Sequence, residues 1–141
     1  MISKRLTAMM AGAALSALVG CMTTTDTPAP SEHLAAYAAS TNYPSVKAEQ
    51  STEVGVTIEP SSKTLRVLNF GQKSIDNCEV WLNGTFVYKV DTIPGDGYVT
   101  LREADFYDRF GHSYADTQST PSRIELRYGD HLWTMLGPIV Q

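Results

Sequence analysis

The chain has 141 residues, of which 43% are hydrophobic, and it carries a formal net charge of -4 at pH 7. This length predicts one domain with a hydrophobic core of its own. The acidic balance and the lack of a Lys/Arg cluster argue against a nucleic-acid partner, whose phosphates require a basic surface.

The chain begins with a short leader. Lys4 and Arg5 precede an apolar run from Leu6 to Val19, which is shorter than the ~20 residues that a membrane-spanning helix needs. A basic segment followed by an apolar segment and then by small residues is typical of a secretory signal peptide, which we predict over residues 1–20. The run ends in Leu18-Val19-Gly20-Cys21, which resembles the lipobox of bacterial lipoproteins.

The lipobox resemblance implies a membrane anchor. In proteins with this motif the leader is cut before the cysteine and the cysteine is lipidated, so we expect acyl chains such as palmitate on Cys21. The membrane is then the expected partner of the chain. Met22 follows the cysteine, at the position where an Asp often retains similar proteins in the inner membrane. The resemblance therefore favours the outer membrane, with the protein facing the periplasm.

Residues 21–53 are predicted to join this anchor to the folded domain. The segment 22–31 is rich in Thr and Pro and poor in apolar residues, so we expect an extended tether. Ser31 is the predicted N-cap of a short helix over residues 32–39. Such a short helix is marginal alone, so it either docks on the domain or stays unfolded. The side chains available for docking on one helical face are Leu34, Tyr37 and Ala38.

The domain itself is predicted over residues 54–141 and is all-β. Apolar positions on both faces of its middle strands indicate two packed layers. The pattern resembles a small immunoglobulin-like or fibronectin-like antiparallel β-sandwich with one short internal helix over 104–110, and a small closed barrel is the alternative. The predicted strands are 54–58, 64–70, 78–82, 85–90, 98–101, 123–128 and 131–136.

The dipeptide Asn83-Gly84 predicts the first of two tight hairpins, because both central residues of a type I′ turn need positive φ. A two-residue loop at this position places Trp81 opposite Phe86, and Glu79 opposite Tyr88. The rings of Trp81, Phe86 and Tyr88 would then share one face. If exposed, they could stack on a sugar or hold a peptide. If helices cover them they belong to the core, which we favour because large exposed apolar patches are rare on monomers.

The dipeptide Gly129-Asp130 predicts a second two-residue hairpin with a type II′ turn. This turn places Tyr128 opposite His131, and Leu126 opposite Trp133. We expect these four residues to lie on the core side of the hairpin, together with Ile124 and Met135.

Catalytic and metal sites are not expected. The closest polar cluster is Asp105, Asp108 and His112, but Gly111 should end the helix before His112, and two oxygens and one nitrogen fall short of a calcium site. The remaining histidines have no second ligand at a metal-binding spacing. Cys78 lies in a strand pattern without a local activating base and is predicted to be a small buried hydrophobe. We therefore predict no catalytic residue, no metal and no cofactor.

These observations predict a non-enzymatic envelope protein that acts as a binding or scaffolding module. Its partner is expected to be an envelope protein or a glycan. The alternative is carbohydrate or peptidoglycan binding, or weak hydrolysis, through the face of Trp81 and Tyr88 with Glu79 nearby.

Overall fold

The computed structural model describes residues 30–140, so the predicted leader, Cys21 and the tether lie outside the described residues. The elements are α1 (Pro30–Ser40), β1 (Glu49–Glu59), β2 (Thr64–Asn69), β3 (Ile75–Leu82), β4 (Phe86–Ile93), β5 (Gly97–Arg102), the 3₁₀ turns η1 (Glu103–Asp105) and η2 (Tyr114–Thr117), β6 (Ile124–Tyr128) and β7 (His131–Val140). The prediction of a mostly β domain is confirmed. No helix in this part of the chain is long and apolar enough to cross a membrane.

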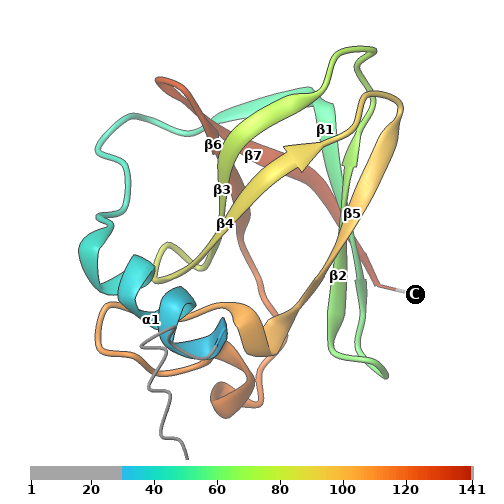
Figure 1. Ribbon diagram of the computed structural model, residues 1–141. Helices are drawn as coiled ribbons and strands as arrows, with labels where there is room; N and C mark the ends of the chain where they lie inside the picture. The colour runs from blue at the N-terminus through green and yellow to red at the C-terminus, as the bar shows by residue number, and fades with distance from the viewer. Residues whose placement is uncertain (1–29, 141) are drawn as a thin grey trace, which may run out of the picture.

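All seven strands form a single mixed sheet in the order β4-β3-β6-β7-β1-β2-β5. The neighbours pair antiparallel except β1 and β7, which run parallel. The sheet curls until its terminal strands, β4 and β5, contact each other, which gives a nearly closed, barrel-like body (Figure 1). The predicted two-layer immunoglobulin-like sandwich is not confirmed, because the β1–β7 pairing joins both halves into one sheet.

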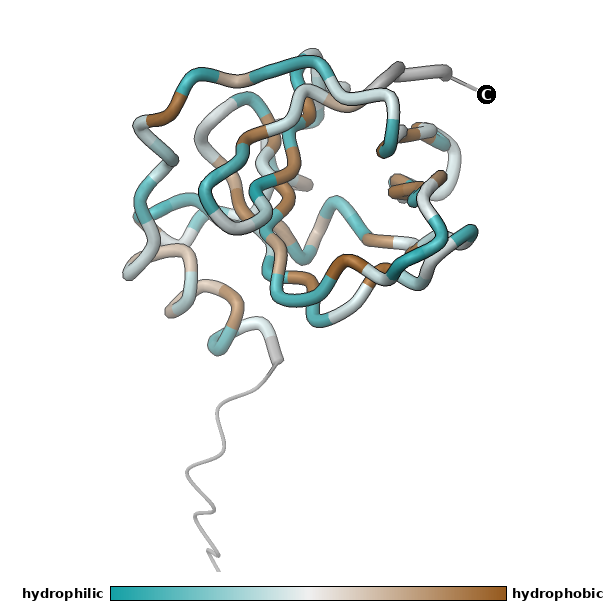
Figure 2. The backbone as a smooth tube through the Cα atoms, turned by 90° about the horizontal axis from the view of Figure 1, so that it is seen from above, coloured by the Kyte–Doolittle hydropathy of each residue, from teal (hydrophilic) through white to brown (hydrophobic). Residues whose placement is uncertain are grey.

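The core fills the inside of this curled sheet. Hydrophobic and hydrophilic residues alternate along much of the chain (Figure 2), as expected for strands with one face turned inward. Cys78 is fully buried, as predicted from its strand pattern. The fully buried aliphatic side chains of this core include Val54, Ile58, Val67, Val80, Leu82, Ile93 and Leu126.

One end of the barrel is closed by the segment between β5 and β6. Phe106 and Tyr114 are almost fully buried there. The ring of Tyr114 meets that of Phe86 edge-on at 5.0 Å, and the ring of Phe106 lies 5.6 Å from that of Tyr88. These four rings form a plug. The segment between β5 and β6, which supplies two of them, lies at the same end of the barrel as α1 (Figure 1).

The predicted helix over 104–110 is wrong. Only Glu103–Asp105 forms a 3₁₀ turn, and Phe110, the last residue of the predicted helix, is 76% exposed. The cause is Asp108, whose Oδ1 accepts hydrogen bonds from the backbone N–H groups of Phe110 at 2.9 Å and His112 at 2.8 Å. Such side-chain bonds stabilise a turn in place of a helix.

The first hairpin contains a β-bulge that the dipeptide did not predict. Asn83 and Gly84 have positive φ angles of 53° and 69°, and the N–H of Thr85 donates to the carbonyl of Leu82, as in a type I′ turn. Leu82 nevertheless pairs with Phe86, so Thr85 is an extra residue between the turn and β4. The predicted register of this hairpin is therefore wrong by one residue.

The second hairpin has the predicted register. Tyr128 pairs with His131, and Leu126 with Trp133. Gly129 has a φ of 57°, which the first central position of a type II′ turn requires. The expected end of the last strand at Gly137-Pro138 is wrong, because β7 continues to Val140.

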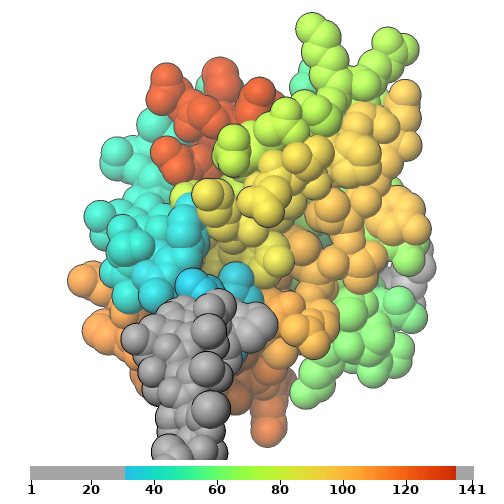
Figure 3. Space-filling model, viewed as in Figure 1, coloured from blue at the N-terminus to red at the C-terminus, as the bar shows by residue number. Residues whose placement is uncertain are grey.

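The helix α1 lies against the outside of β4 (Figure 3). It begins at Pro30, so Ser31 lies within its first turn and is not the N-cap. Of the two alternatives left open by the sequence, the structure shows the docked helix: Ala38 is 1% exposed, and with Tyr37 it packs on Trp81 and Val87. Because only one side of this short helix is covered, its stability depends on that contact.

Candidate functional site

A sizeable cavity lies at the end of the barrel away from α1. Its volume is about 450 Å³, which is within the range of small-ligand sites, and barrel mouths are a common place for them. We call it the mouth. One wall is the β6–β7 hairpin and the other is the loop between β2 and β3, both at the upper end of the molecule in Figure 1. The lining residues are Glu53, Asn69, Gly71, Gln72, Lys73, Ser74, Ile75, Tyr128 and Trp133.

The hairpin wall carries a row of aromatic rings. The tight turn at Gly129 brings Tyr128, His131 and Trp133 to the same side of the two strands. The rings of His131 and Trp133 are stacked, with centroids 5.8 Å apart and planes at 19°. The Tyr128 ring lies 6.1 Å from Trp133 and is 39% exposed. Two of these aromatic side chains, Tyr128 and Trp133, therefore line the mouth.

The opposite wall is a polar loop held in place by Asn69. The Asn69 side chain is 3% exposed, and its Nδ2 donates to the carbonyls of Lys73 at 2.8 Å and Ile93 at 3.3 Å. Its Oδ1 accepts from the N–H of Gly71 at 3.0 Å. These bonds fix the backbone of the loop that carries Gln72 and Lys73 at the cavity.

The structure separates the three rings predicted to share one face. Because of the bulge, Phe86 and Tyr88 pack against the barrel core, whereas Trp81 lies on the outside with Val87. Trp81 is 2% exposed, since the Tyr43 ring packs edge-on against it at 5.3 Å. The shared aromatic face is therefore wrong, and the alternative that α1 and its neighbours cover Trp81 is confirmed.

Trp81 is covered by residues 37–43, which we call the strap. The strap is held by two buried carboxylates, Glu79 on β3 and Glu125 on β6, which are 5% and 2% exposed. The Tyr37 hydroxyl donates to Glu79 Oε1 at 2.5 Å, and the Tyr43 hydroxyl donates to Glu125 Oε2 at 2.6 Å. Burial and these hydrogen bonds raise the pKa of both phenols to about 12.

Two arginines of the β6 region complete the strap contacts. Arg127 Nη1 lies 3.2 Å from Glu79, and Arg123 Nε lies 3.4 Å from Glu125. Trp81 Nε1 also donates to Glu79 Oε2 at 3.1 Å. Each buried carboxylate thus has an arginine and a tyrosine as partners, which is the condition for burying a charge without a large penalty.

Asp105, Asp108 and His112, the polar cluster considered from the sequence, do not come together as one site. Asp105 pairs with Arg102 at 2.9 Å, away from the other two residues. Asp108 Oδ2 lies 3.0 Å from His112 Nδ1. Burial alone would raise the pKa of Asp108, but the hydrogen bonds from His112 and from the Phe110 N–H outweigh it and hold that pKa below its usual value. The contact between Asp108 and His112 therefore stabilises the turn that contains Phe110.

Other reactive groups are also placed in structural roles. Burial raises the pKa of the Cys78 thiol to about 12, so it carries no thiolate near neutral pH. Within residues 30–140, no group of three His, Cys, Asp or Glu side chains could hold a metal ion.

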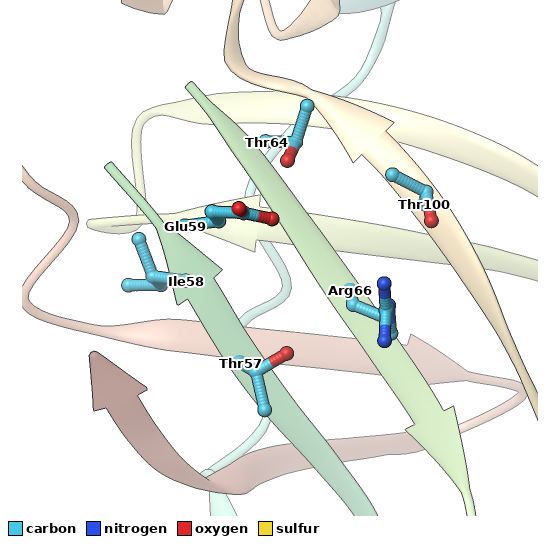
Figure 4. Close-up of a pocket in the computed structure, with 6 residues that line it drawn as sticks. All are labelled: Thr57, Ile58, Glu59, Thr64, Arg66 and Thr100. Carbon is cyan, nitrogen blue, oxygen red and sulfur yellow. The ribbon is translucent and has the colours of Figure 1, made fainter. Parts of the chain in front are cut away.

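A second depression lies on the outer face of β1, β2 and β5 (Figure 4). Thr57, Arg66 and Thr100 stand there on neighbouring strands. Its volume of about 50 Å³ is room for little more than water, so we do not treat it as a ligand site.

The mouth was missed from the sequence because its rings were assigned to the core. The alternation that makes Leu126 and Met135 internal also includes Tyr128 and His131. The signal that separates them is their position beside the turn, where the hairpin extends past the core.

No protein family matches this chain, and the comparisons with curated proteins and with solved structures found no significant similarity. Any function assigned to the mouth therefore rests on the geometry of this chain alone.

Proposed function

We propose that this protein is a lipoprotein of the cell envelope, anchored through Cys21, and that it acts as a non-catalytic binding module. The proposed location is the outer membrane, with the domain in the periplasm. The lipobox Leu18-Val19-Gly20-Cys21 supports the anchor. The proposed binding site is the mouth.

The position of the mouth suits an anchored binding protein. The described chain begins at Pro30, at the α1 end of the barrel, so the anchored segment joins the domain at that end. The plug of Phe106 and Tyr114 closes the same end. The β6–β7 hairpin and the β2–β3 loop, which line the mouth, lie at the other end of the barrel (Figure 1). This position would hold a ligand away from the lipid surface.

The ligand class that fits best is a saccharide, and the aromatic row beside a polar loop is the observation that carries this proposal. Sugar rings have apolar C–H faces, which pack on the faces of side chains such as Tyr128 and Trp133. Their hydroxyls need donors and acceptors, and Glu53, Gln72 and Lys73 line the same cavity. Glycan strands of the cell wall are the saccharides available in the proposed location.

The test is a binding panel of peptidoglycan fragments and neutral oligosaccharides, read by the fluorescence of Trp133 and by calorimetry. Tyr128→Ala should weaken binding about tenfold, since one ring stack contributes roughly 1–1.5 kcal/mol. Phe110→Ala is the matched control, because Phe110 is exposed at the opposite end. Equal loss in both variants, or no saturable binding to any glycan, would contradict the proposal.

The anchor has its own test. Mass spectrometry of the protein extracted from membranes should find acyl chains on Cys21. The Cys21→Ser variant should carry no acyl chains. An unmodified Cys21 in the soluble fraction would refute the anchor. The proposed binding site would then be tested by the glycan panel alone.

A second proposed mode, binding through the face of Trp81 and Tyr88, has less support from the geometry. Tyr88 packs in the barrel and Trp81 is covered by the strap. A glycan complex lost in Trp81→Phe but kept in Tyr128→Ala would favour that mode.

A further inference from the structure

The most exposed large hydrophobic side chain of the described residues is Phe110, at 76%. A single exposed ring needs no explanation by itself. Phe110, however, stands at the tip of a small hairpin that the structure holds rigidly, and this hairpin lies at the anchored end of the domain.

The hairpin is fixed by backbone and side-chain bonds. Tyr107 forms an isolated bridge with Ser113, and Tyr107 also bridges Val87 of β4. Between them the Gly111 N–H donates to the Asp108 carbonyl at 3.1 Å, which closes a tight turn.

The Asp108 carboxylate reinforces this turn by accepting the backbone N–H groups of Phe110 and His112. Gly111 has a φ of 85°, a conformation that favours glycine. The hydrogen bonds of Asp108 and the conformation of Gly111 therefore hold Phe110 in solvent.

The tip carries a cation beside the ring. The Arg109 guanidinium lies 5.6 Å from the centroid of the Phe110 ring. An aromatic ring with an adjacent arginine is the combination that binds the interface of a lipid bilayer, where the ring enters the headgroup region and the cation meets lipid phosphates.

The length of chain outside the structure brings this tip within reach of lipid. Cys21 and Pro30 are separated by nine peptide steps, which span at most about 32 Å. The helix α1 has 11 residues and is therefore about 16 Å long. The residues that follow it, including Tyr43, share a cavity of about 270 Å³ with Arg109 and Phe110.

We propose that the Arg109-Phe110 tip is a second membrane contact, which docks the anchored domain on the surface of its bilayer and fixes the direction of the mouth. The occupant of this surface is the lipid headgroup layer. The inference rests on the proposed lipid anchor, because a single ring and one cation bind a bilayer measurably only when a tether holds them near it.

The experiment places an environment-sensitive fluorophore at the tip. Phe110→Cys is labelled in the acylated chain, in which Cys21 is consumed by lipid and Cys78 is fully buried. The protein is reconstituted in vesicles of phosphatidylethanolamine and phosphatidylglycerol. Tyr98→Cys is the matched control, because Tyr98 is 52% exposed at the start of β5, on the mouth side.

The expected result is a blue shift of the probe at residue 110 and its quenching by nitroxide lipids, with neither at residue 98. Arg109→Glu should lower the quenched fraction about fivefold on these anionic vesicles. A probe at 110 that does not respond to lipid, or equal responses at 110 and 98, would overturn the proposal. Protection of residue 110 only after envelope proteins are added would assign the tip to a protein partner and overturn it as well.

A second arm separates this inference from the anchor. Residues 22–141 are held on nickel-chelating lipid by a histidine tag in place of residues 1–21, so the tether is kept without acylation. If the native chain fails to associate with vesicles in all variants, the lipid anchor is wrong. The tagged chain then still decides whether the tip contacts the bilayer.

Discussion

The hydrogen bond between Tyr37 and Glu79 should determine how firmly the strap is held. The Tyr37 hydroxyl donates to a carboxylate that is 5% exposed, and hydrogen bonds to charged groups contribute about 1.5–3 kcal/mol. Glu79 keeps Trp81 Nε1 and Arg127 as partners when the hydroxyl is removed, so the carboxylate is not left unpaired. We therefore expect Tyr37→Phe to cost about 1.5 kcal/mol, the low end of this range.

A double-mutant cycle isolates this contribution. Tyr37→Phe, Glu79→Gln and the double variant are compared by urea unfolding, and their coupling energy should be about 1 kcal/mol or more. Amide hydrogen exchange in α1 gives a local readout, which should accelerate about tenfold in Tyr37→Phe if the helix opens before the barrel. Tyr98→Phe is the control, because Tyr98 is 52% exposed and surface changes usually stay within about 0.5 kcal/mol.

Two results would refute the reasoning. A coupling energy below about 0.3 kcal/mol would mean that the two residues act independently. Exchange that accelerates by the same factor in α1 and in the barrel strands would mean that the strap and the barrel unfold as one unit and that the helix does not open separately.

Three further predictions follow from other parts of the domain. Because the phenol pKa of Tyr37 and Tyr43 is about 12 in the fold and near 10 in the unfolded chain, their stabilisation is complete below pH 10 and should be lost as the pH rises through 12. Urea unfolding in alkaline buffers tests this, and the paired Phe variants should flatten the loss. Cys78→Ser should cost about 1–3 kcal/mol by burying a hydroxyl, and the native thiol should resist Ellman's reagent until the protein unfolds; full stability of the variant would show that the site is not buried. Gly95→Ala should destabilise by about 3 kcal/mol, since its Cβ would lie 2.0 Å from the Gln72 carbonyl oxygen; an unchanged melting temperature would contradict this.

The parts of the fold that depend on neighbouring residues were predictable from the sequence. The second hairpin needs only Gly129 at its turn and alternating residues on both sides. The apolar side chains on one face of α1, including Tyr37 and Ala38, indicated how the helix could dock, but they left open whether it docks or stays unfolded. The burial of Cys78 follows from its strand pattern.

The parts that depend on distant contacts were not predictable. The Asn83 side chain accepts bonds from the backbone N–H groups of Ser122 and Arg123, and this long-range attachment accompanies the bulge that turns Phe86 inward. The strap joins Tyr43 to a carboxylate 82 residues away. No local pattern reports either contact, and the position of the mouth rings depends on the same assembly of distant segments.

The central place of β7 in the sheet has a consequence for how the domain comes together during synthesis. β7 is the last strand in the chain, yet it lies between β6 and β1 and so joins the three-stranded half β4-β3-β6 to the half β1-β2-β5. A nascent chain in which β7 has not yet been made therefore has two partial ribbons with unpaired edges, which are prone to aggregation. Such a nascent chain should not complete its sheet until the residues of β7 have been synthesised.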